Sequence, residues 1–184
     1  MKTDKGKLVV ISAPSGAGKG TVIKELMKFD PNLKLSVSAT TRKPRPGEVD
    51  GVAYHFISHE HFQDMISNNE FLEYAQYIDE YYGTPIRLIN ENIDTGITVL
   101  LEIDVQGAKQ IKMKKPDAIS IFIMAPSMEE LENRLRGRGT DSEEKLIARL
   151  KRAKQELIES SFYDHTVIND DPKRAANEML TFIK

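Results

Sequence analysis

The amino-acid sequence predicts an α/β fold: a parallel sheet with helices on both faces, an inserted small strand-rich lobe and a short helical lid. Short β-branched runs alternate with helical patterns, which indicates a mostly parallel sheet covered on both sides. A glycine-rich turn joins the first strand to the first helix. The region from Thr40 to Tyr82 breaks this rhythm with prolines, glycines and aromatic residues, which indicates the inserted lobe. A chain of 184 residues is long enough for one such domain.

Buried strands are predicted wherever short apolar runs rich in β-branched residues end in turn residues. The first run occupies residues 7–12, and similar runs occupy residues 97–104, 118–125 and 165–169. The first helix follows the glycine-rich turn. Four apolar residues recur on it at helical spacing and are expected to face the core: Val22, Ile23, Leu26 and Met27. A short amphipathic helix in the inserted region carries Phe62, Met65 and Ile66.

Later helices are predicted from residue types that cap helix N-termini. The capping pairs are Ser127 with Glu130, Thr140 with Glu143, and Asp171 with Pro172, where proline suits the first helical position. The second of these helices carries Leu146, Ile147, Leu150 and Leu157. The last helix is expected to bury Ala176, Met179, Leu180 and Ile183.

Composition and charge exclude several classes of protein. Hydrophobic residues make up 40% and charged residues 29% of the chain, as in globular rather than disordered proteins. A formal charge of −2 argues against nucleic acid as a partner, so any anion site must be local. The absence of cysteine excludes disulfides, a thiolate nucleophile and cysteine-based metal sites. The apolar runs are shorter than a membrane span and the N-terminus lacks an apolar signal core, which predicts a cytoplasmic protein without a membrane partner.

The turn "APSGAGKGT", from Ala13 to Thr21, has the composition of a phosphate-binding loop. Glycines at 16 and 18 allow backbone N–H groups to point at phosphate oxygens, and the N-terminus of the following helix adds a partial positive charge. Lys19 is placed to neutralise phosphate charge. The match to G-x-x-x-x-G-K-[ST] is imperfect: Ala13 replaces the first glycine and Gly20 replaces the hydroxyl residue, with Thr21 as the nearest substitute. The alternative is a glycine-rich turn with a solvated lysine.

Two acidic residues, Glu102 and Asp104, lie two positions apart at the end of the second predicted strand. Because residues two apart in a strand share a face, both carboxylates point to one side near the edge where open α/β sheets bind ligands. Asp104 is equally suited to cap the helix that follows it. Its roles as a cap and as a site residue both stay open.

Two groups of arginines have the chemistry of phosphate binding. Arg134, Arg136, Arg138 and Arg149 surround a glycine-punctuated turn that suits a lid closing over phosphates, although some of them are expected to sit in solvent or pair with glutamates. In "TTRKPRPGEVDGVAYHF", prolines stiffen a loop that carries Arg42 and Arg45, which predicts a second phosphate site. Tyr54 and Tyr82 are able to donate hydrogen bonds there; the alternative is a basic surface turn with the tyrosines in a hairpin core.

Six ordered motifs resemble those of guanylate kinases: "SGAGKGT", "SVSATTRKPRPGEVDGVAYHF", "FLEYAQYIDEYYGTP", "LLEIDVQGAKQIK", "RLRGRGT" and "VINDD". The resemblance runs from about Lys7 to the end of the chain. It implies a P-loop nucleoside monophosphate kinase fold and ATP-dependent phosphorylation of GMP and dGMP, within purine nucleotide metabolism. One domain is implied, with a core (about 1–35, 85–130 and 155–184), a GMP-binding lobe (about 36–84) and a lid (about 131–154). Oligomeric state is left open.

The resemblance also implies roles for particular residues. ATP is expected to bind the loop Ala13, Pro14, Ser15, Gly16, Ala17, Gly18, Lys19, Gly20 and Thr21 with Arg134 and Arg138, and Asn169 is expected beside the adenine. The GMP phosphate is assigned to Arg42, Arg45, Tyr54 and Tyr82, and the guanine to Ser38, Glu73, Thr84 and one or both of Glu102 and Asp104. Lys19, Arg45, Arg138 and Arg149 are the expected catalytic residues. No protein metal site is expected, because Mg²⁺ would arrive with ATP and be held largely through water.

Three other functions are compatible with parts of the sequence. A guanylate-kinase-like peptide-binding module would keep the fold without catalysis, but such modules usually lose the loop glycines and Lys19, which are present here. A kinase of another nucleoside monophosphate or of a phosphorylated ribose would keep the chemistry, although Glu73 favours guanine, which offers it two N–H donors. His55, His59 and His61 would be the ligands of a metal site, but their predicted elements differ.

Overall fold

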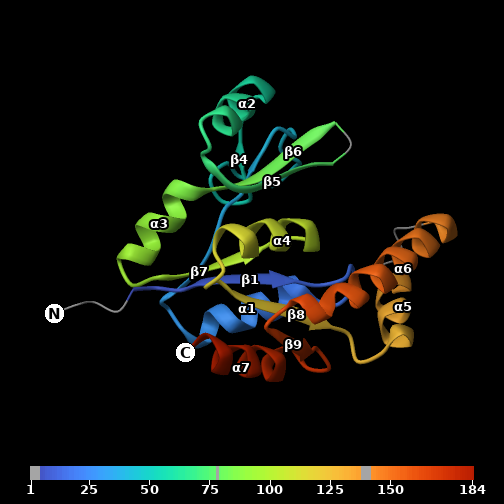
Figure 1. The fold of residues 1–184 in the computed structure, drawn as a ribbon. Coiled ribbons are helices and arrows are strands. Elements are labelled where there is room, and N and C mark those ends of the chain that lie inside the picture. The colour runs from blue at the N-terminus through green and yellow to red at the C-terminus, as the bar shows by residue number, and fades with distance from the viewer. Residues whose placement is uncertain (1–4, 78, 138–141) are drawn as a thin grey trace.

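The core of the molecule is a parallel sheet with strand order β2-β7-β1-β8-β9 (Figure 1). The computed structural model describes residues 5–77, 79–137 and 142–184. The strands are β1 (Leu8–Ser12), β2 (Leu33–Leu35), β7 (Thr98–Glu102), β8 (Ile119–Met124) and β9 (His165–Ile168). From β1 the chain therefore runs to the edge strand β2, returns to β7 beside β1, and then crosses to β8 and β9 on the other side, which places the switch in strand order at β1.

Helices cover both faces of this sheet (Figure 1). One face packs against α1 (Lys19–Phe29) and α7 (Pro172–Ile183), and the other against α3 (Ile86–Asp94) and α4 (Val105–Lys114). The helices α5 (Met128–Arg136) and α6 (Glu143–Ile158) lie beyond the end of the sheet at which β1 terminates, and a 3₁₀ turn, Glu159–Phe162, leads from α6 toward β9. The result is the predicted three-layer α/β architecture.

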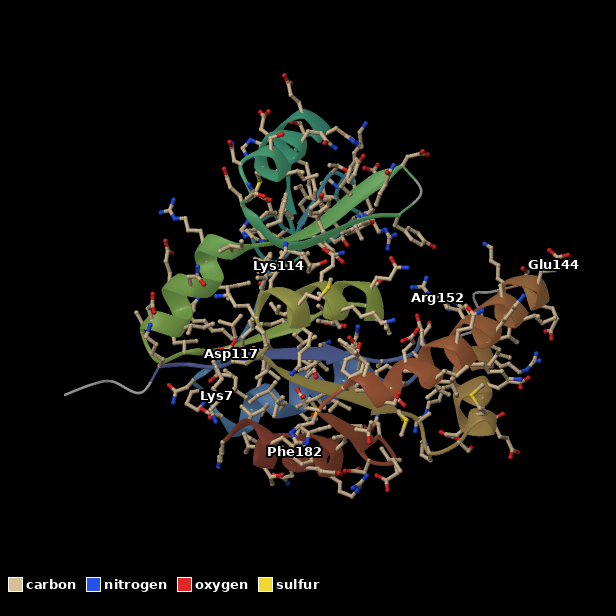
Figure 2. All side chains as sticks on the ribbon, in the orientation of Figure 1. Lys7, Lys114, Asp117, Glu144, Arg152 and Phe182 are labelled. Atoms are coloured by element: carbon tan, nitrogen blue, oxygen red, sulfur yellow. The ribbon has the colours of Figure 1, made fainter. Side chains whose placement is uncertain are left out.

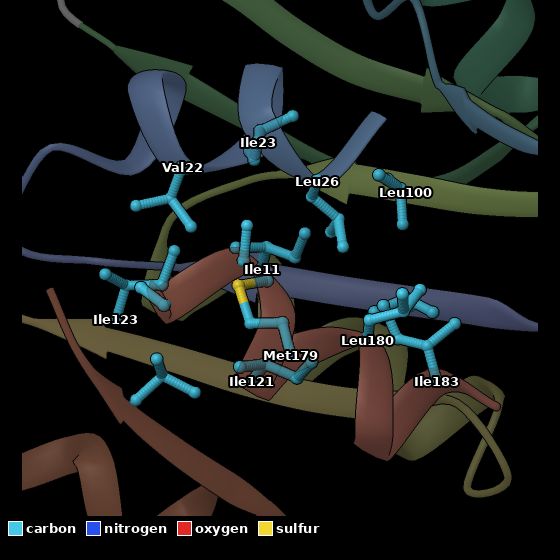
Figure 3. Close-up of a cluster of buried hydrophobic side chains, with 14 of the residues drawn as sticks. Ile11, Val22, Ile23, Leu26, Leu100, Ile121, Ile123, Met179, Leu180 and Ile183 are labelled. Carbon is cyan, nitrogen blue, oxygen red and sulfur yellow. The ribbon is translucent and has the colours of Figure 1, made fainter. Parts of the chain in front are cut away.

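Apolar side chains that alternate along β1 fill the two faces of the sheet. Ile11 packs with Leu26 and Met179 between the sheet and the pair α1 and α7, as Figure 3 shows. Val10 points to the opposite face, where it packs with Ile111 of α4. All five residues of β1 are buried, and the four before Ser12 are apolar rather than alternating with polar residues.

The inserted lobe contains a second, smaller sheet with strand order β4-β3-β6-β5, at the top of Figure 1. Its elements are β3 (Ala39–Thr40), β4 (His55–Phe56), α2 (His59–Ser67), β5 (Phe71–Tyr77) and β6 (Glu80–Pro85). The lobe has its own small core, in which the rings of Phe62 and Phe71 stack with centroids 4.3 Å apart. The predicted helix is observed at α2, with Phe62 buried and Met65 and Ile66 packed beside it.

The four predicted core strands and the caps at Ser127 and Asp171 are observed, whereas other details differ. Met27 was expected in the core and is 37% exposed, because α1 turns only its Val22, Ile23 and Leu26 face toward α7. Ile147 is likewise exposed on α6. The N-cap of α6 is Ser142, whose hydroxyl accepts from Lys145 N; Thr140 lies outside the described residues. Strand β2 was not predicted, because its edge position buries only Leu33.

Within the described part of the chain, no helix is long and apolar enough to cross a lipid bilayer.

Replacing Leu26 by alanine is expected to lower the free energy of unfolding by about 2–5 kcal/mol, because it leaves a cavity between α1 and α7 where the side chain is fully buried. Urea denaturation measures the change. Met27→Ala, the next residue on the same helix, is the matched control and is expected to change stability by no more than about 0.5 kcal/mol. Equal losses in the two variants would contradict this assignment of the helix face.

Candidate functional site

The carboxyl ends of the parallel strands bring together the residues singled out by sequence. The glycine-rich loop follows β1, Glu102 ends β7, Asn169 follows β9, and Ser38 lies a few residues beyond β2. Because parallel strands end at the same edge, segments more than a hundred residues apart in the chain meet there. The site is therefore a product of the sheet order.

The loop has the backbone conformation that phosphate binding requires. Gly16 and Gly18 have φ angles of 92° and 86°, in the left-handed region that other residues avoid, and Gly18 is the N-cap of α1. Lys19 begins the helix, with its Nζ 3.7 Å from a Glu102 carboxylate oxygen. Burial lowers the pKa of Lys19, while the neighbouring Glu102 and Asp104 oppose that shift. Gly20 and Thr21 are exposed, so the hydroxyl of Thr21 is not enclosed by the loop.

Asn169 and Arg134 support this loop through hydrogen bonds. The Asn169 side-chain amide donates to the Ala17 carbonyl oxygen at 2.7 Å, and Asn169 is only 3% exposed. Arg134 donates from Nη2 to the Asn169 carbonyl oxygen at 3.0 Å and from Nε to Glu130 at 2.8 Å. The resemblance named both as ATP-binding residues; their contacts with the loop backbone were not predicted. Such contacts link side chains to distant carbonyl groups and leave no pattern in the sequence.

A cavity of about 310 Å³ lies between the lobe and the end of the core sheet. Its lining includes six of the residues that sequence placed around a second ligand: Ser38, Tyr54, Glu73, Tyr82, Glu102 and Asp104. A neighbouring cavity of about 370 Å³ is lined by Lys19 and shares Ser38, Tyr54, Glu102, Ile103 and Asp104 with the first. The two cavities are therefore neighbours with five lining residues in common, one containing Glu73 and the other containing Lys19.

Glu73 is a buried acid in the lining of the 310 Å³ cavity. It is 6% exposed, and one carboxylate oxygen accepts a hydrogen bond from the hydroxyl of Thr84, which is itself fully buried. Burial raises the pKa of Glu73, and the nearby charge of Asp104 raises it further, whereas Thr84 and Lys114 act in the opposite direction. Thr84 thus contributes to the site by holding Glu73.

The arginine-rich turn of the lobe is ordered by Glu48, which was not predicted from the sequence. Arg42 donates to both Glu48 carboxylate oxygens at 2.9 Å, and the backbone N–H of Arg45 donates to Glu48 at 2.7 Å. These contacts lower the pKa of Glu48 to about 2. The Arg42 guanidinium also lies 5.3 Å from the centroid of the Tyr54 ring. The Arg45 side chain is exposed and lies outside the lining of both cavities.

Tyr54 and Tyr82 pack edge to face, with ring centroids 5.9 Å apart, and both line the 310 Å³ cavity. The rings pack against each other and also line a cavity, so a role in binding a ligand stays a prediction. For Asp104 the capping role is observed and the site role stays a prediction. Its carboxylate accepts from Gly107 N at 2.9 Å, capping α4, and it lines both cavities.

Arg152 is a site residue that sequence reasoning missed. It lies on α6, lines the 310 Å³ cavity, and has its guanidinium 3.8 Å from Asp104 and 2.8 Å from Glu156 (Figure 2). The only sequence signal was its place in the basic run "RLKRAK". Arg149 lies on the same helix, outside the lining of these cavities, and Arg138 lies outside the described residues. Arg136 pairs with Glu132 and Glu143, in keeping with the simpler expectation for some of these arginines.

The three histidines considered as metal ligands belong to two elements. His55 lies in β4, whereas His59 and His61 lie in the first turn of α2, and His59 contacts Glu80 at 3.1 Å. Across residues 5–77, 79–137 and 142–184, no three histidine, aspartate or glutamate side chains are grouped closely enough to hold a metal ion.

Comparisons with known proteins give one family. The model of the guanylate kinase family matches residues 5–184. A guanylate kinase of Prochlorococcus marinus is 52% identical over 178 residues, covering 97% of each chain, and one of Clostridioides difficile is 54% identical over 179 residues, covering 97% of this chain and 87% of the relative. The crystal structure of guanylate kinase from Anaplasma phagocytophilum superposes with a TM-score of 0.78 at 35% identity, covering 100% of this chain and 87% of that one.

Replacing Thr84 by valine is expected to raise the pKa of Glu73 above its value in the unmodified protein. Valine preserves the shape of threonine but removes the hydroxyl that donates to the carboxylate and favours its charged form. An NMR titration of the Glu73 carboxyl carbon measures the change. Thr40→Val, an equally buried site in the same lobe whose hydroxyl donates to Tyr81, is the control and should leave Glu73 unchanged. A lower pKa in Thr84→Val would contradict this assignment.

Proposed function

The chain belongs to the guanylate kinase family, and we propose that it phosphorylates GMP in the 310 Å³ cavity with ATP held at the loop Ala13–Thr21. One observation supports this arrangement above the others. The cavity that contains the buried acid Glu73 adjoins the cavity at Lys19, and the two share the lining residues Ser38, Tyr54, Glu102, Ile103 and Asp104. A base at one end and a phosphate donor at the other are what transfer to a nucleoside monophosphate requires.

Guanine is the base that suits Glu73. A carboxylate accepts from both the N1–H and the 2-amino group of guanine, whereas adenine offers neither donor at those positions. Adenine would leave the buried carboxylate without these partners, and a buried unpaired acceptor is costly. Ser38 lines the pocket and Thr84 acts through its hydrogen bond to Glu73, with Asp104 or Glu102 at the margin. We place dGMP in the same pocket.

The phosphate of GMP is assigned to the turn of the lobe. Arg42 and Arg45 match phosphate oxygens with their guanidinium forks, and the hydroxyls of Tyr54 and Tyr82 are the additional donors. Glu48 keeps Arg42 in an extended position beside Tyr54, so the turn is organised by its own acid.

ATP is assigned to the loop and the arginines of the lid. Backbone N–H groups of the loop and the N-terminus of α1 bind the phosphates, with Lys19 as the charged contact. Arg138 and Arg149 are assigned to the phosphates from the lid (131–154), and Arg134 and Asn169 to the remaining ATP contacts beside the loop. Closure of the lid and of the lobe (36–84) onto the core would exclude water, whose attack would waste ATP.

The reaction needs charge neutralisation and alignment rather than a protein base. An oxygen of the GMP phosphate, already largely ionised near neutral pH, attacks the γ-phosphorus of ATP in line; the new P–O bond gives GDP as the bond to the β-phosphate oxygen breaks and ADP leaves. Mg²⁺ bound to ATP supplies further neutralisation of phosphate charge. Glu102, with a part-exposed carboxylate beside Lys19, fits a contact to the water around that ion.

A coupled assay of ADP release with ATP, Mg²⁺ and GMP, dGMP, AMP, CMP or UMP tests the proposed function. Turnover is expected with the two guanine nucleotides alone, because Glu73 selects the base. Activity on another base would retain the phosphate loop and remove the assignment of Glu73. A folded protein that is inactive on all five substrates would indicate a peptide-binding module instead.

Lys19→Met and Arg45→Ala are each expected to lower turnover by about 10²–10³-fold or more without unfolding the protein. Each substitution removes a positive charge assigned to a phosphate that takes part in the transfer. Steady-state kinetics and circular dichroism together measure the effect. Lys24→Met, on the exposed side of α1, is the control for a lost lysine on the same helix. Unchanged turnover in folded Lys19→Met would refute the assignment of the phosphate loop.

A further inference from the structure

Helix α4 offers one face to strand β5, and three residues on that face contact three consecutive residues of the strand. Gly107, Gln110 and Lys114 are spaced three and four residues apart, so they share one side of the helix. They meet Glu73, Tyr74 and Leu72 respectively. In Figure 1, α4 lies between the core sheet and the lobe, and Figure 2 labels Lys114 where the helix faces the lobe.

Gln110 binds the backbone of β5 as a neighbouring strand would. Its amide oxygen accepts from Tyr74 N at 3.3 Å, and its amide nitrogen donates to the Tyr74 carbonyl oxygen at 3.0 Å. β5 is an edge strand of the small sheet, so its outer backbone groups face away from β6. Lys114 donates to the carbonyl oxygen of Leu72, two residues before Tyr74 in the same strand, at 2.7 Å.

Gly107 provides the space into which Glu73 fits. A Cβ atom at residue 107 would lie 2.9 Å from Glu73 Oε2 and 3.3 Å from its carboxyl carbon, closer than side chains normally approach. Glycine inside a helix is about 1 kcal/mol less favourable than alanine, so helix formation does not explain its presence. The close approach of Glu73 does.

We propose that Gly107 and Gln110 are positioning residues for guanine recognition: they fix the depth and the direction at which strand β5 presents Glu73 to the base. This inference rests on the proposed function of Glu73. Leu72 strengthens the contact, because it is 3% exposed and packs with Ala108 and Ile111 in the core of the main domain. The base-reading strand is thereby fixed to the core through α4, in addition to its pairing with β6.

Gln110→Ala is expected to raise the KM for GMP by about 10-fold, because two hydrogen bonds that hold β5 are lost, while the KM for ATP stays within about 2-fold. Preference for GMP over AMP is expected to fall as well. Met113→Ala, on the exposed side of the same helix, is the control and should change neither constant. Gly107→Ala is the second variant: it favours the helix but displaces Glu73, so the KM for GMP should rise without a matching loss of thermal stability.

The pKa of Glu73 gives a readout that needs no substrate. In Gln110→Ala it is expected to fall toward the ordinary value of 4.5, because a loosened strand admits water to the carboxylate whose burial raises its pKa. A pKa of Glu73 equal to that of the unmodified protein in Gln110→Ala, or an unchanged KM for GMP in both folded variants, would overturn the inference. Equal rises in the KM for GMP and for ATP would do so too. Failure of the unmodified protein to phosphorylate GMP would instead refute the proposed function.

Discussion

The complete burial of strand β1 between two parallel neighbours determines where both parts of the site lie. Pairing aligns Ile11 with Glu102 on one side and Ser12 with Phe122 on the other. Because the loop starts at the next residue, this register fixes the distance between Lys19 and Glu102. A shift by one residue would turn every side chain of β1 to the opposite face and exchange the two hydrophobic cores. The geometry of the loop is therefore set by packing far from it.

Three of the cations assigned to phosphate binding have an acidic neighbour. Lys19 lies near Glu102, Arg42 is held by Glu48, and Arg134 is held by Glu130. These acids keep long side chains extended in the direction of the site, which reduces the rotamer freedom lost when an anion binds.

The sequence predicted the features that come from local patterns. The core strands, the glycine-rich loop and the caps at Ser127 and Asp171 follow from apolar runs, glycine spacing and capping residues. Three sets of contacts were not predictable in this way: the hydrogen bond from Asn169 to the loop, the contacts of Glu48 with the turn, and the hydrogen bonds between Gln110 and β5. They are contacts from side chains to backbone groups, and Asn169 and Gln110 reach partners 152 and 36 residues away. Met27 was misplaced because spacing alone does not say how wide the buried face of α1 is.

The lobe couples base recognition to phosphate alignment because its strands are joined in one sheet. β5 carries Glu73 and pairs with β6, which carries Tyr82 and pairs with β3; Arg42 follows β3 after one intervening residue, Thr41. A displacement of β5 is therefore passed through backbone hydrogen bonds to the residues assigned to the GMP phosphate. Because β5 is held against α4, a base that fits Glu73 poorly would also leave its phosphate displaced from the line between Arg42 and Lys19. Selectivity would then arise in transfer as well as in binding, because phosphoryl transfer depends on that alignment.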